Sequence, residues 1–297
     1  MLNNLLDKYV WILDTINRYG KIGRRNLDEL WKKSKFSRGE GLPRRTFYNY
    51  RLAIEEIFGI EIKYNSSTQE YYIEDSTNHN GASMTDWLLN SASTNIVLGN
   101  ARNIAERILL EDVPSAREHL ATVMEAIKEN KKLEFDYAPY TRINPSREVV
   151  IEPLFLNLFR QRWYVTGQTS DNKIKTYALD RILNAKMLQV AATAIDNFDV
   201  DEYTRYAYGV IFSKGKPHDI VLRVDSNRAK YLRTLPLHTS QREEIHDRYS
   251  LFYYKLRLTP DFISEILSLG ASVTVVSPLE LRTMVLDELR RTLDNYS

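Results

Sequence analysis

The sequence predicts an α+β protein with several domains, and three observations carry this prediction. Residues 1–75 contain three segments of helical apolar periodicity followed by two alternating segments, the pattern of short helices and a hairpin. From residue 131 the apolar side chains recur with a period of two, and the last third follows a strand–helix–strand–strand–helix–strand order. The 297 residues include 43% hydrophobic ones, which is enough for more than one core.

The predicted first domain, residues 1–75, begins with three helices. The first covers 2–19, where apolar residues share one face and Gly20 ends the helix. A second helix is predicted over 26–35, and a third over 43–58 with a proline in its first turn, where the missing N–H costs little. The apolar stripe of the third helix consists of Phe47, Tyr50, Ile54, Ile57 and Phe58.

A β-hairpin is predicted to follow, with strands over 60–64 and 69–73 around a polar turn. Three helices and then a hairpin is the order of a winged helix-turn-helix, which places its third helix in the major groove. With the apolar stripe inward, the outer side of this helix presents side chains that can pair with bases or phosphates. Together with neighbouring basic residues, the predicted DNA contacts are Lys35, Arg38, Arg44, Arg45, Thr46, Tyr48, Asn49, Arg51 and Lys63.

The net charge of +2 conceals an uneven distribution. Residues 21–52 hold ten basic and three acidic residues, a net charge of +7, so the remaining residues carry −5. Because the basic segment coincides with the predicted groove-reading helix, it indicates a localised contact with a polyanion such as double-stranded DNA. The alternatives are a solvated basic face and a helical module that contacts another protein.

Residues 76–130 are predicted to be a linker and a helical connector. Its helices are expected over 84–89, 96–110 and 115–129, the last of which buries Leu120, Val123, Met124 and Ile127. Such a connector suits dimer formation, and packing within one chain fits it equally well. A small β-barrel is predicted for residues 131–195, because about five short strands follow each other there. They are expected at 131–137, 148–153, 163–169, 173–178 and 187–190.

A second linker, over 196–216, is predicted to lead to a C-terminal domain, residues 217–297. Its strands are expected over 220–224, 241–245, 249–258 and 272–276, and its helices over 226–233, 261–269 and 279–293. This is the split pattern of a ferredoxin-like domain with one extra helix.

Several short segments together resemble one protein family. The barrel region carries Gln161-Arg162-Trp163-Tyr164-Val165-Thr166-Gly167 and Tyr177-Ala178-Leu179-Asp180-Arg181-Ile182, after Ser146-Arg147 and Ile151-Glu152-Pro153-Leu154. These residues are similar to the WYL-domain family of bacterial transcriptional regulators, named for a Trp-Tyr-Leu triplet whose third position is Val165 here. Two further segments resemble the C-terminal extension domain of that family, Leu235-Pro236-Leu237-His238-Thr239-Ser240-Gln241 and Ser277-Pro278-Leu279-Glu280-Leu281-Arg282.

The resemblance implies a regulator with an SH3/Sm-like barrel, a nucleotide or single-stranded nucleic-acid effector, and a homodimeric state. An aromatic plane beside a fixed guanidinium can hold a base and a phosphate. The predicted effector contacts are Tyr137, Ser146, Arg147, Arg162, Trp163, Tyr164, Tyr177 and Arg181. Trp163 and Tyr164 point to opposite faces of one strand, so at most one of them lies in the core. The alternatives are that Trp163 is core, and that Arg181 pairs with Asp180 or Glu152.

No residue pattern supports enzymatic or metal chemistry. The chain has no cysteine, which excludes disulfides, thiol nucleophiles and Cys-ligated metals. Its five histidines lack metal-binding spacing, and the sequence contains neither a nucleophile elbow nor a phosphate-binding glycine loop. We therefore expect no catalytic residue, no metal and no cofactor. Without a signal peptide or a run of about 18 apolar residues, we expect no membrane span and a cytoplasmic location.

Two functional hypotheses follow. The favoured one is a DNA-binding transcriptional regulator, not an enzyme, whose barrel binds an effector and thereby shifts a dimer between two DNA-binding states. The alternative is an accessory protein of a defence or DNA-damage system. In that case the barrel binds an effector or single-stranded nucleic acid, and the first domain serves only for docking.

Overall fold

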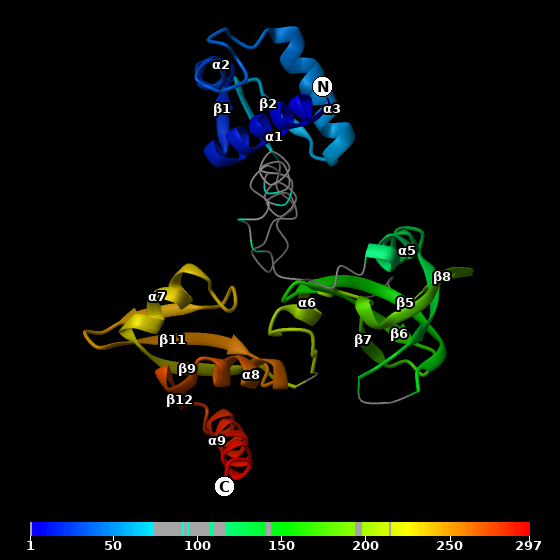
Figure 1. Cartoon of the computed structure of the whole chain (residues 1–297), viewed down its shortest axis with the longest axis vertical. Helices are drawn as coiled ribbons and strands as arrows, with labels where there is room; N and C mark the ends of the chain where they lie inside the picture. The colour runs from blue at the N-terminus through cyan, green and yellow to red at the C-terminus, as the bar shows by residue number, and fades with distance from the viewer. Residues whose placement is uncertain are drawn as a thin grey trace. The chain divides into compact units, whose positions relative to one another are not determined.

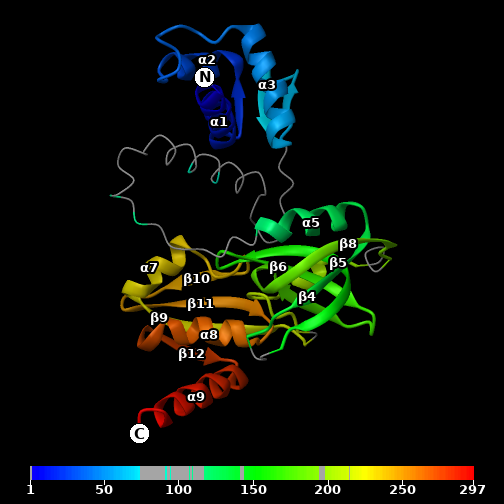
Figure 2. The same cartoon turned by 45° about the vertical axis from the view of Figure 1, so that its right-hand side comes forward.

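The computed structural model describes residues 2–73, 117–140, 144–193, 198–213 and 215–297, with the single positions 91, 94, 107 and 109. The predicted helix over 84–89 and nearly all of the one over 96–110 lie outside these residues. The chain divides into two compact units, Met1–Leu110 and Glu111–Ser297, and most of their helices and strands are labelled in Figures 1 and 2. All strand pairs of the three described sheets are antiparallel, so the fold is α+β and multidomain, as predicted.

The described part of the first unit contains three helices and a three-stranded sheet. Its elements are α1 (Leu2–Tyr19), β1 (Lys21–Gly23), α2 (Arg24–Lys32), α3 (Arg44–Phe58), β2 (Ile62–Asn65) and β3 (Glu70–Ile73). The strand order is β1-β3-β2, so β1 adds a third strand to the predicted hairpin. Sequence patterns do not reveal β1, because three residues are too few to show a period.

The core of the first unit is formed by all three helices and the sheet. Its fully buried side chains include Ile12, Leu13, Ile16, Leu27 and Ile62. From α3, Phe47 and Ile54 join this core, and Phe58 packs against it. The prediction that Ile57 belongs to the same stripe is wrong, because its side chain is 55% exposed. Three residues beyond Ile54 the helix has turned by about 300°, which carries Ile57 past the edge of the buried face.

The second unit begins with a helix and a five-stranded sheet. The elements are α5 (Arg117–Lys128), β4 (Lys131–Tyr137), β5 (Ser146–Phe159), β6 (Arg162–Thr169), β7 (Ile174–Ala178), the 3₁₀ turn η2 (Leu179–Arg181) and β8 (Ile182–Ala191). The strand order is β7-β6-β5-β4-β8. The five predicted strands are present, but β5 and β8 are longer than predicted, because register shifts in their pairings interrupt the period of two.

One face of this sheet packs against α5. Val123 and Ala126 of the helix are fully buried against Leu133, Phe135 and other apolar side chains of the strands. Met124, predicted to be buried, is instead 48% exposed. Each residue of a helix is rotated by about 100° from the previous one, so the neighbour of a centrally buried residue points outward.

Residues 198–213 are more than the linker predicted for 196–216. They contain the short helix α6 (Val200–Thr204). Three rings of this segment, those of Phe198, Tyr203 and Phe212, each contact the Phe155 ring of β5, and Tyr203 also contacts the other two, with centroids 5.0 to 6.3 Å apart. The segment is therefore packed onto the sheet of the same unit.

The C-terminal part of the second unit has the predicted element order. It consists of β9 (His218–Asp225), α7 (Ser226–Thr234), β10 (Arg242–Ile245), β11 (Tyr249–Leu256), α8 (Pro260–Ser268), the 3₁₀ turn η4 (Gly270–Ser272), β12 (Val273–Ser277) and α9 (Leu279–Asp294). The strand order β10-β11-β9-β12 is the one that the split strand–helix pattern produces. Buried side chains of α7 and α8 form one core with one face of this sheet.

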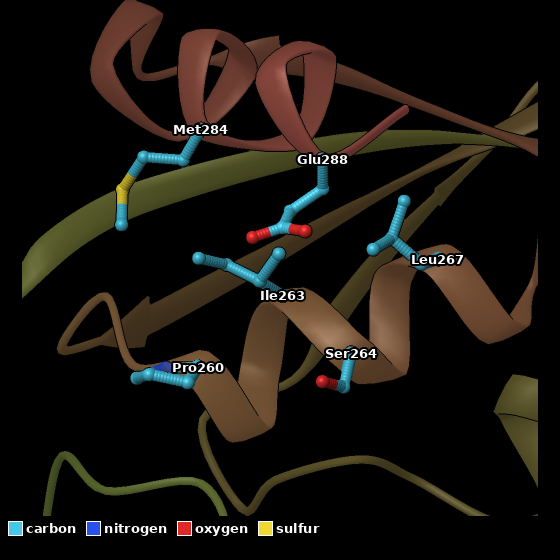
Figure 3. A pocket seen from close by; sticks show the side chains of 6 residues that line it. All are labelled: Pro260, Ile263, Ser264, Leu267, Met284 and Glu288. Atoms are coloured by element: carbon cyan, nitrogen blue, oxygen red, sulfur yellow. The ribbon is translucent and has the colours of Figure 1, made fainter. Parts of the chain in front are cut away.

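A groove of about 260 Å³ lies between α8 and α9. Figure 3 shows Met284 and Glu288 of α9 facing Ile263 and Leu267 of α8. Glu288 is the one ionisable side chain that lines the groove, and it pairs with Arg291 on its own helix. The groove is thus a largely apolar contact between two helices, and its carboxylate is already paired on its own helix.

Candidate functional site

A groove of about 1160 Å³ opens on the first unit. The beginning of α2, the outer side of α3 and the β2–β3 hairpin line it together. The polar and aromatic side chains on its walls are Arg24, Arg25, Asn26, Asp28, Arg44, Arg45, Phe47, Tyr48, Arg51, Tyr64, Thr68, Gln69, Glu70 and Tyr71. Its dominant charge is therefore positive.

Helix α3 contributes four of the predicted DNA contacts to this groove. Arg44, Arg45 and Tyr48 are exposed, and neither arginine has an ion-pair partner among the described residues. Arg51 also lines the groove, but its guanidinium is 3.3 Å from the Glu55 carboxylate. The other predicted contacts do not line it: Lys35, Arg38 and Asn49 are exposed elsewhere, and Thr46 and Lys63 are half-buried.

Two adjacent arginines at the start of α2 have different environments. The Arg24 guanidinium lies 5.1 Å from the Phe47 ring centroid, 3.4 Å from the Asp28 carboxylate, and donates to the Leu42 carbonyl. Arg25 is exposed and has no partner among the described residues. Arg24 therefore holds α2 against α3, whereas Arg25 is available to a ligand. The basic segment of the sequence includes both arginines, but the sequence does not distinguish the structural role of Arg24 from the exposed position of Arg25.

Both helices that border the groove begin with an arginine pair. Neither α2 nor α3 has an acidic residue in its first turn or a side chain that caps its N-terminus. The first N–H groups of a helix carry partial positive charge, which usually favours acidic residues there. Four arginines at two such positions raise the positive potential in one groove, and an anion would relieve their mutual repulsion.

A second polar cluster, the η2 cluster, surrounds the η2 turn of the second unit and consists of Tyr140, Arg162, Tyr164, Asp180 and Arg181. Arg162 lies with its guanidinium 3.3 Å from Oδ2 of Asp180, whose side chain is 10% exposed. The Arg181 guanidinium lies 3.9 Å from the ring centroid of Tyr140, and its Nε is buried without a hydrogen-bond partner. The ion pair considered for Arg181 is absent from the described residues, because Asp180 pairs with Arg162, and Glu152 with Lys132 at 2.9 Å.

Tyr164 belongs to this cluster, and Trp163 does not. Tyr164 lies opposite Asn157 in the β5–β6 pairing, and burial raises the pKa of its hydroxyl while the nearby cations Arg162 and Arg181 lower it. Trp163 points to the other face and packs against the core of the sheet. The two neighbours thus lie on opposite faces, as the strand period predicts.

The eight predicted effector contacts therefore do not form one site. Tyr177 is only 8% exposed and packs edge-on against Phe135 and Tyr137, so its predicted role at a ligand surface is wrong. The Tyr137 hydroxyl accepts a backbone N–H from Ala178 at 3.4 Å. Arg147 is exposed and Ser146 half-buried where β5 begins, opposite the end of β4.

Tyr140, a residue of the η2 cluster that is 72% exposed, is not among the predicted effector contacts. No signal marks it, because it lies beyond the end of β4 and belongs to no periodic segment. Elsewhere among the described residues, no group of three His, Asp or Glu side chains could hold a metal ion. Within the same residues, no helix is long and apolar enough to cross a membrane.

Each of the two parts of the second unit matches a known domain family. Residues 118–187 match the WYL domain, and residues 216–293 match the WCX domain. The two matches follow each other along one chain and cover about half of it. The chain belongs to the WYL-domain family.

Solved structures give weaker likenesses. Proteasome accessory factor B/C (PafBC) of Arthrobacter aurescens has 18% sequence identity and a TM-score of 0.34, over 98% of this chain and 46% of its own. The chain thus spans about half the length of that protein. A CRISPR Cas-related protein has 9% identity and a TM-score of 0.40, over 92% of this chain and 72% of its own. No curated protein matches the chain. The family assignment therefore depends on the WYL and WCX matches.

Proposed function

We propose that this protein is a DNA-binding transcriptional regulator whose WYL domain responds to a nucleotide-like effector. In this proposal the first unit is a winged helix-turn-helix with α3 as the recognition helix and β2–β3 as the wing. The five-stranded sheet is an SH3/Sm-like barrel that holds the effector, and the protein acts as a cytoplasmic homodimer. No catalytic step is assigned to the chain.

The observation that carries the DNA-binding part is the set of unpaired cations in the first groove. Arg25, Arg44 and Arg45 are exposed and lack carboxylate partners among the described residues. Only two acidic residues, Asp28 and Glu70, line the groove. Of these, Asp28 lies within 3.7 Å of both Arg24 and Lys32. Phosphates satisfy such cations, while arginine side chains on α3 can also pair with guanine.

The effector part is supported by the η2 cluster. Arg181 is fixed over an exposed aromatic ring and has no carboxylate partner among the described residues. A cation beside an exposed ring offers both charge and a stacking surface to a nucleotide. An effector that binds one of two dimer states more tightly shifts the population toward it, and with it the spacing of the two DNA-binding units.

A duplex-binding titration at several salt concentrations tests the DNA-binding part. Labelled DNA from the region upstream of the protein's own gene would be titrated with the wild type and with Arg44→Ala plus Arg45→Ala. The double variant should bind at least about tenfold more weakly, and its slope of log K against log salt should be shallower by about two. Arg290→Ala plus Arg291→Ala removes the same charge from α9 and should bind like the wild type. Absence of duplex binding at low salt would overturn the proposal.

The accessory-protein alternative predicts a different footprint. Such a protein would bind an effector or single strands through its second unit and protect no defined sequence upstream of its gene. Arg181→Ala separates the two sites, because it should abolish effector binding and leave duplex binding intact.

A further inference from the structure

Two neighbouring residues of the η2 turn contain buried polar atoms without hydrogen-bond partners. Oδ1 of Asp180 has none, although Oδ2 of the same carboxylate contacts Arg162. Nε of Arg181, the next residue, also has none. About nine-tenths or more of buried polar groups in proteins are hydrogen-bonded, so two such atoms in adjacent residues require an explanation.

The two atoms require opposite partners. A carboxylate oxygen only accepts hydrogen bonds and needs an N–H or O–H donor, whereas a guanidinium nitrogen only donates and needs an acceptor. The described residues supply neither partner. A ligand that carries an anionic oxygen and an N–H donor would satisfy Arg181 and Asp180 together.

The exposed Tyr140 ring narrows the chemistry of such a ligand. The Arg181 guanidinium lies over the ring, 3.9 Å from its centroid, while 72% of the residue remains exposed. A planar nucleobase can stack on an aromatic ring beside an arginine that holds the phosphate. A nucleotide combines the plane, the phosphate and, in three of the common bases, an exocyclic amino group.

We propose that Asp180 determines which bases the effector may carry; this inference rests on the effector function proposed above. Its carboxylate accepts a hydrogen bond from the amino group of adenine, cytosine or guanine. Thymine and uracil present a carbonyl oxygen where adenine and cytosine present the amino group, and their one N–H donor on this edge lies between two carbonyl oxygens, which repel a carboxylate. Asp180 is thus a specificity-determining residue, whereas Arg181 binds the charge that all nucleotides share.

A side chain must move for a base to reach Oδ1, because this atom is covered in the structure. Arg162, whose side chain is 33% exposed, contacts the other oxygen of this carboxylate, Oδ2, at 3.3 Å, so its displacement leaves a second acceptor oxygen free. An effector phosphate competes for this guanidinium and draws it from the carboxylate. Phosphate binding and base reading are then linked in one event.

Fluorescence anisotropy with oligo(dA), oligo(dC) and oligo(dT) of equal length tests the inference. All proteins carry Arg44→Ala and Arg45→Ala, so that the groove of the first unit contributes little. The chain with native Asp180 should bind oligo(dA) and oligo(dC) at least about fivefold more tightly than oligo(dT). Asp180→Asn can turn an amide N–H toward thymine, so its preference should fall below about twofold. Asp180→Glu retains the carboxylate and should keep a preference of more than about twofold.

Asp171→Asn is the matched control, because it removes the same charge from an exposed aspartate in the turn between β6 and β7 and should retain the full preference. Equal binding of all three oligonucleotides by the chain with native Asp180 would overturn the inference and leave the effector function standing. The inference would also be overturned, with the effector function still standing, if Asp180→Asn raised the affinities for all three oligonucleotides by the same factor. Asp180 would then only neutralise Arg162. If no oligonucleotide or nucleotide binds at all, the effector function itself fails.

Discussion

The guanidinium of Arg181 lies 3.9 Å from the ring centroid of Tyr140, although Arg181 belongs to the η2 turn and Tyr140 lies beyond the end of β4. The β4 strand ends at Tyr137, and Ala138 donates its N–H to the Arg181 carbonyl at 3.0 Å, which brings the two segments together. The ring holds the cation in place without neutralising it. The carboxylate that could have neutralised Arg181, Asp180, is engaged by Arg162 instead.

Replacement of Tyr140 should therefore weaken effector binding through the position of Arg181. Tyr140→Ala removes both the cation–π contact and the stacking surface, and we expect binding of nucleotides or single strands to fall by about five- to thirtyfold. Tyr140→Phe keeps the ring and should bind within about twofold of the wild type. Anisotropy titrations of both variants give the comparison. Wild-type affinity in the alanine variant would exclude the ring from the site.

The adjacent residues Arg24 and Arg25 provide a second test, because one is structural and the other is free. Arg25→Ala should leave the stability of the first unit unchanged and make the salt dependence of duplex binding shallower by about 0.9 in log–log slope. Arg24→Ala removes the contacts to Asp28, Leu42 and Phe47, and we expect the first unit to lose about 1–3 kcal/mol of unfolding free energy. Urea unfolding and salt titrations of the two variants measure both quantities. Identical effects of the two substitutions would contradict the assignment of a structural role to Arg24 and a DNA-binding role to Arg25.

The sequence predicts the elements well where one periodicity persists over many residues. Helix α1 has the predicted bounds, and β4 does as well, because each has a long, clean period. The pattern fails at Ile57 and Met124, where the apolar residue lies at the edge of a buried face rather than in it. It also misses β1, whose three residues form a strand only because β3 lies beside them.

Site residues are less predictable than elements, because their roles depend on contacts between distant segments. The basic residues near α3 are visible as a charge cluster, but the contacts that engage Arg24 and leave Arg25 free come from elsewhere in the fold. In the second unit, Tyr177 belongs to a motif and yet is buried, whereas Tyr140 belongs to none and is exposed. A local pattern does not encode which aspartate pairs with which arginine.

High pH provides a third test through Tyr177. Burial raises its pKa to about 12, so the folded state favours the neutral hydroxyl. Below pH 10, the ordinary tyrosine pKa, this contribution to stability is complete, and it is lost as the pH rises from about 10 to 12. Tyr177→Phe keeps the ring but cannot ionise. Denaturant unfolding at several pH values should show the wild type losing stability relative to this variant in that window. A constant difference would show that the hydroxyl is not in a low-dielectric environment.

The junction at Gly209 provides the last test, with a matched control in the same unit. Gly209 has a φ of +86°, and a Cβ added there would lie 2.4 Å from Oδ2 of Asp261. The same oxygen accepts the N–H groups of Val210 and Ile211 at 2.8 and 2.9 Å, which fixes this segment to the start of α8. Gly209→Ala therefore combines backbone strain with a steric clash, and it should cost about 2–5 kcal/mol of unfolding free energy.

Gly270 separates the two contributions, because its φ is +61° and a Cβ added there would meet nothing within 4 Å. Gly270→Ala should cost only the strain of a left-handed conformation, about 1–2 kcal/mol. Hydrogen exchange of the backbone around residues 205–213 should increase in the Gly209 variant and remain native in the Gly270 variant. Because Asn157 of β5, which lies opposite Tyr164, donates to the Gly209 carbonyl at 3.3 Å, the Gly209 variant should also weaken effector binding. If both variants lose equal stability, Asp261 yields to the added methyl group and does not fix the segment.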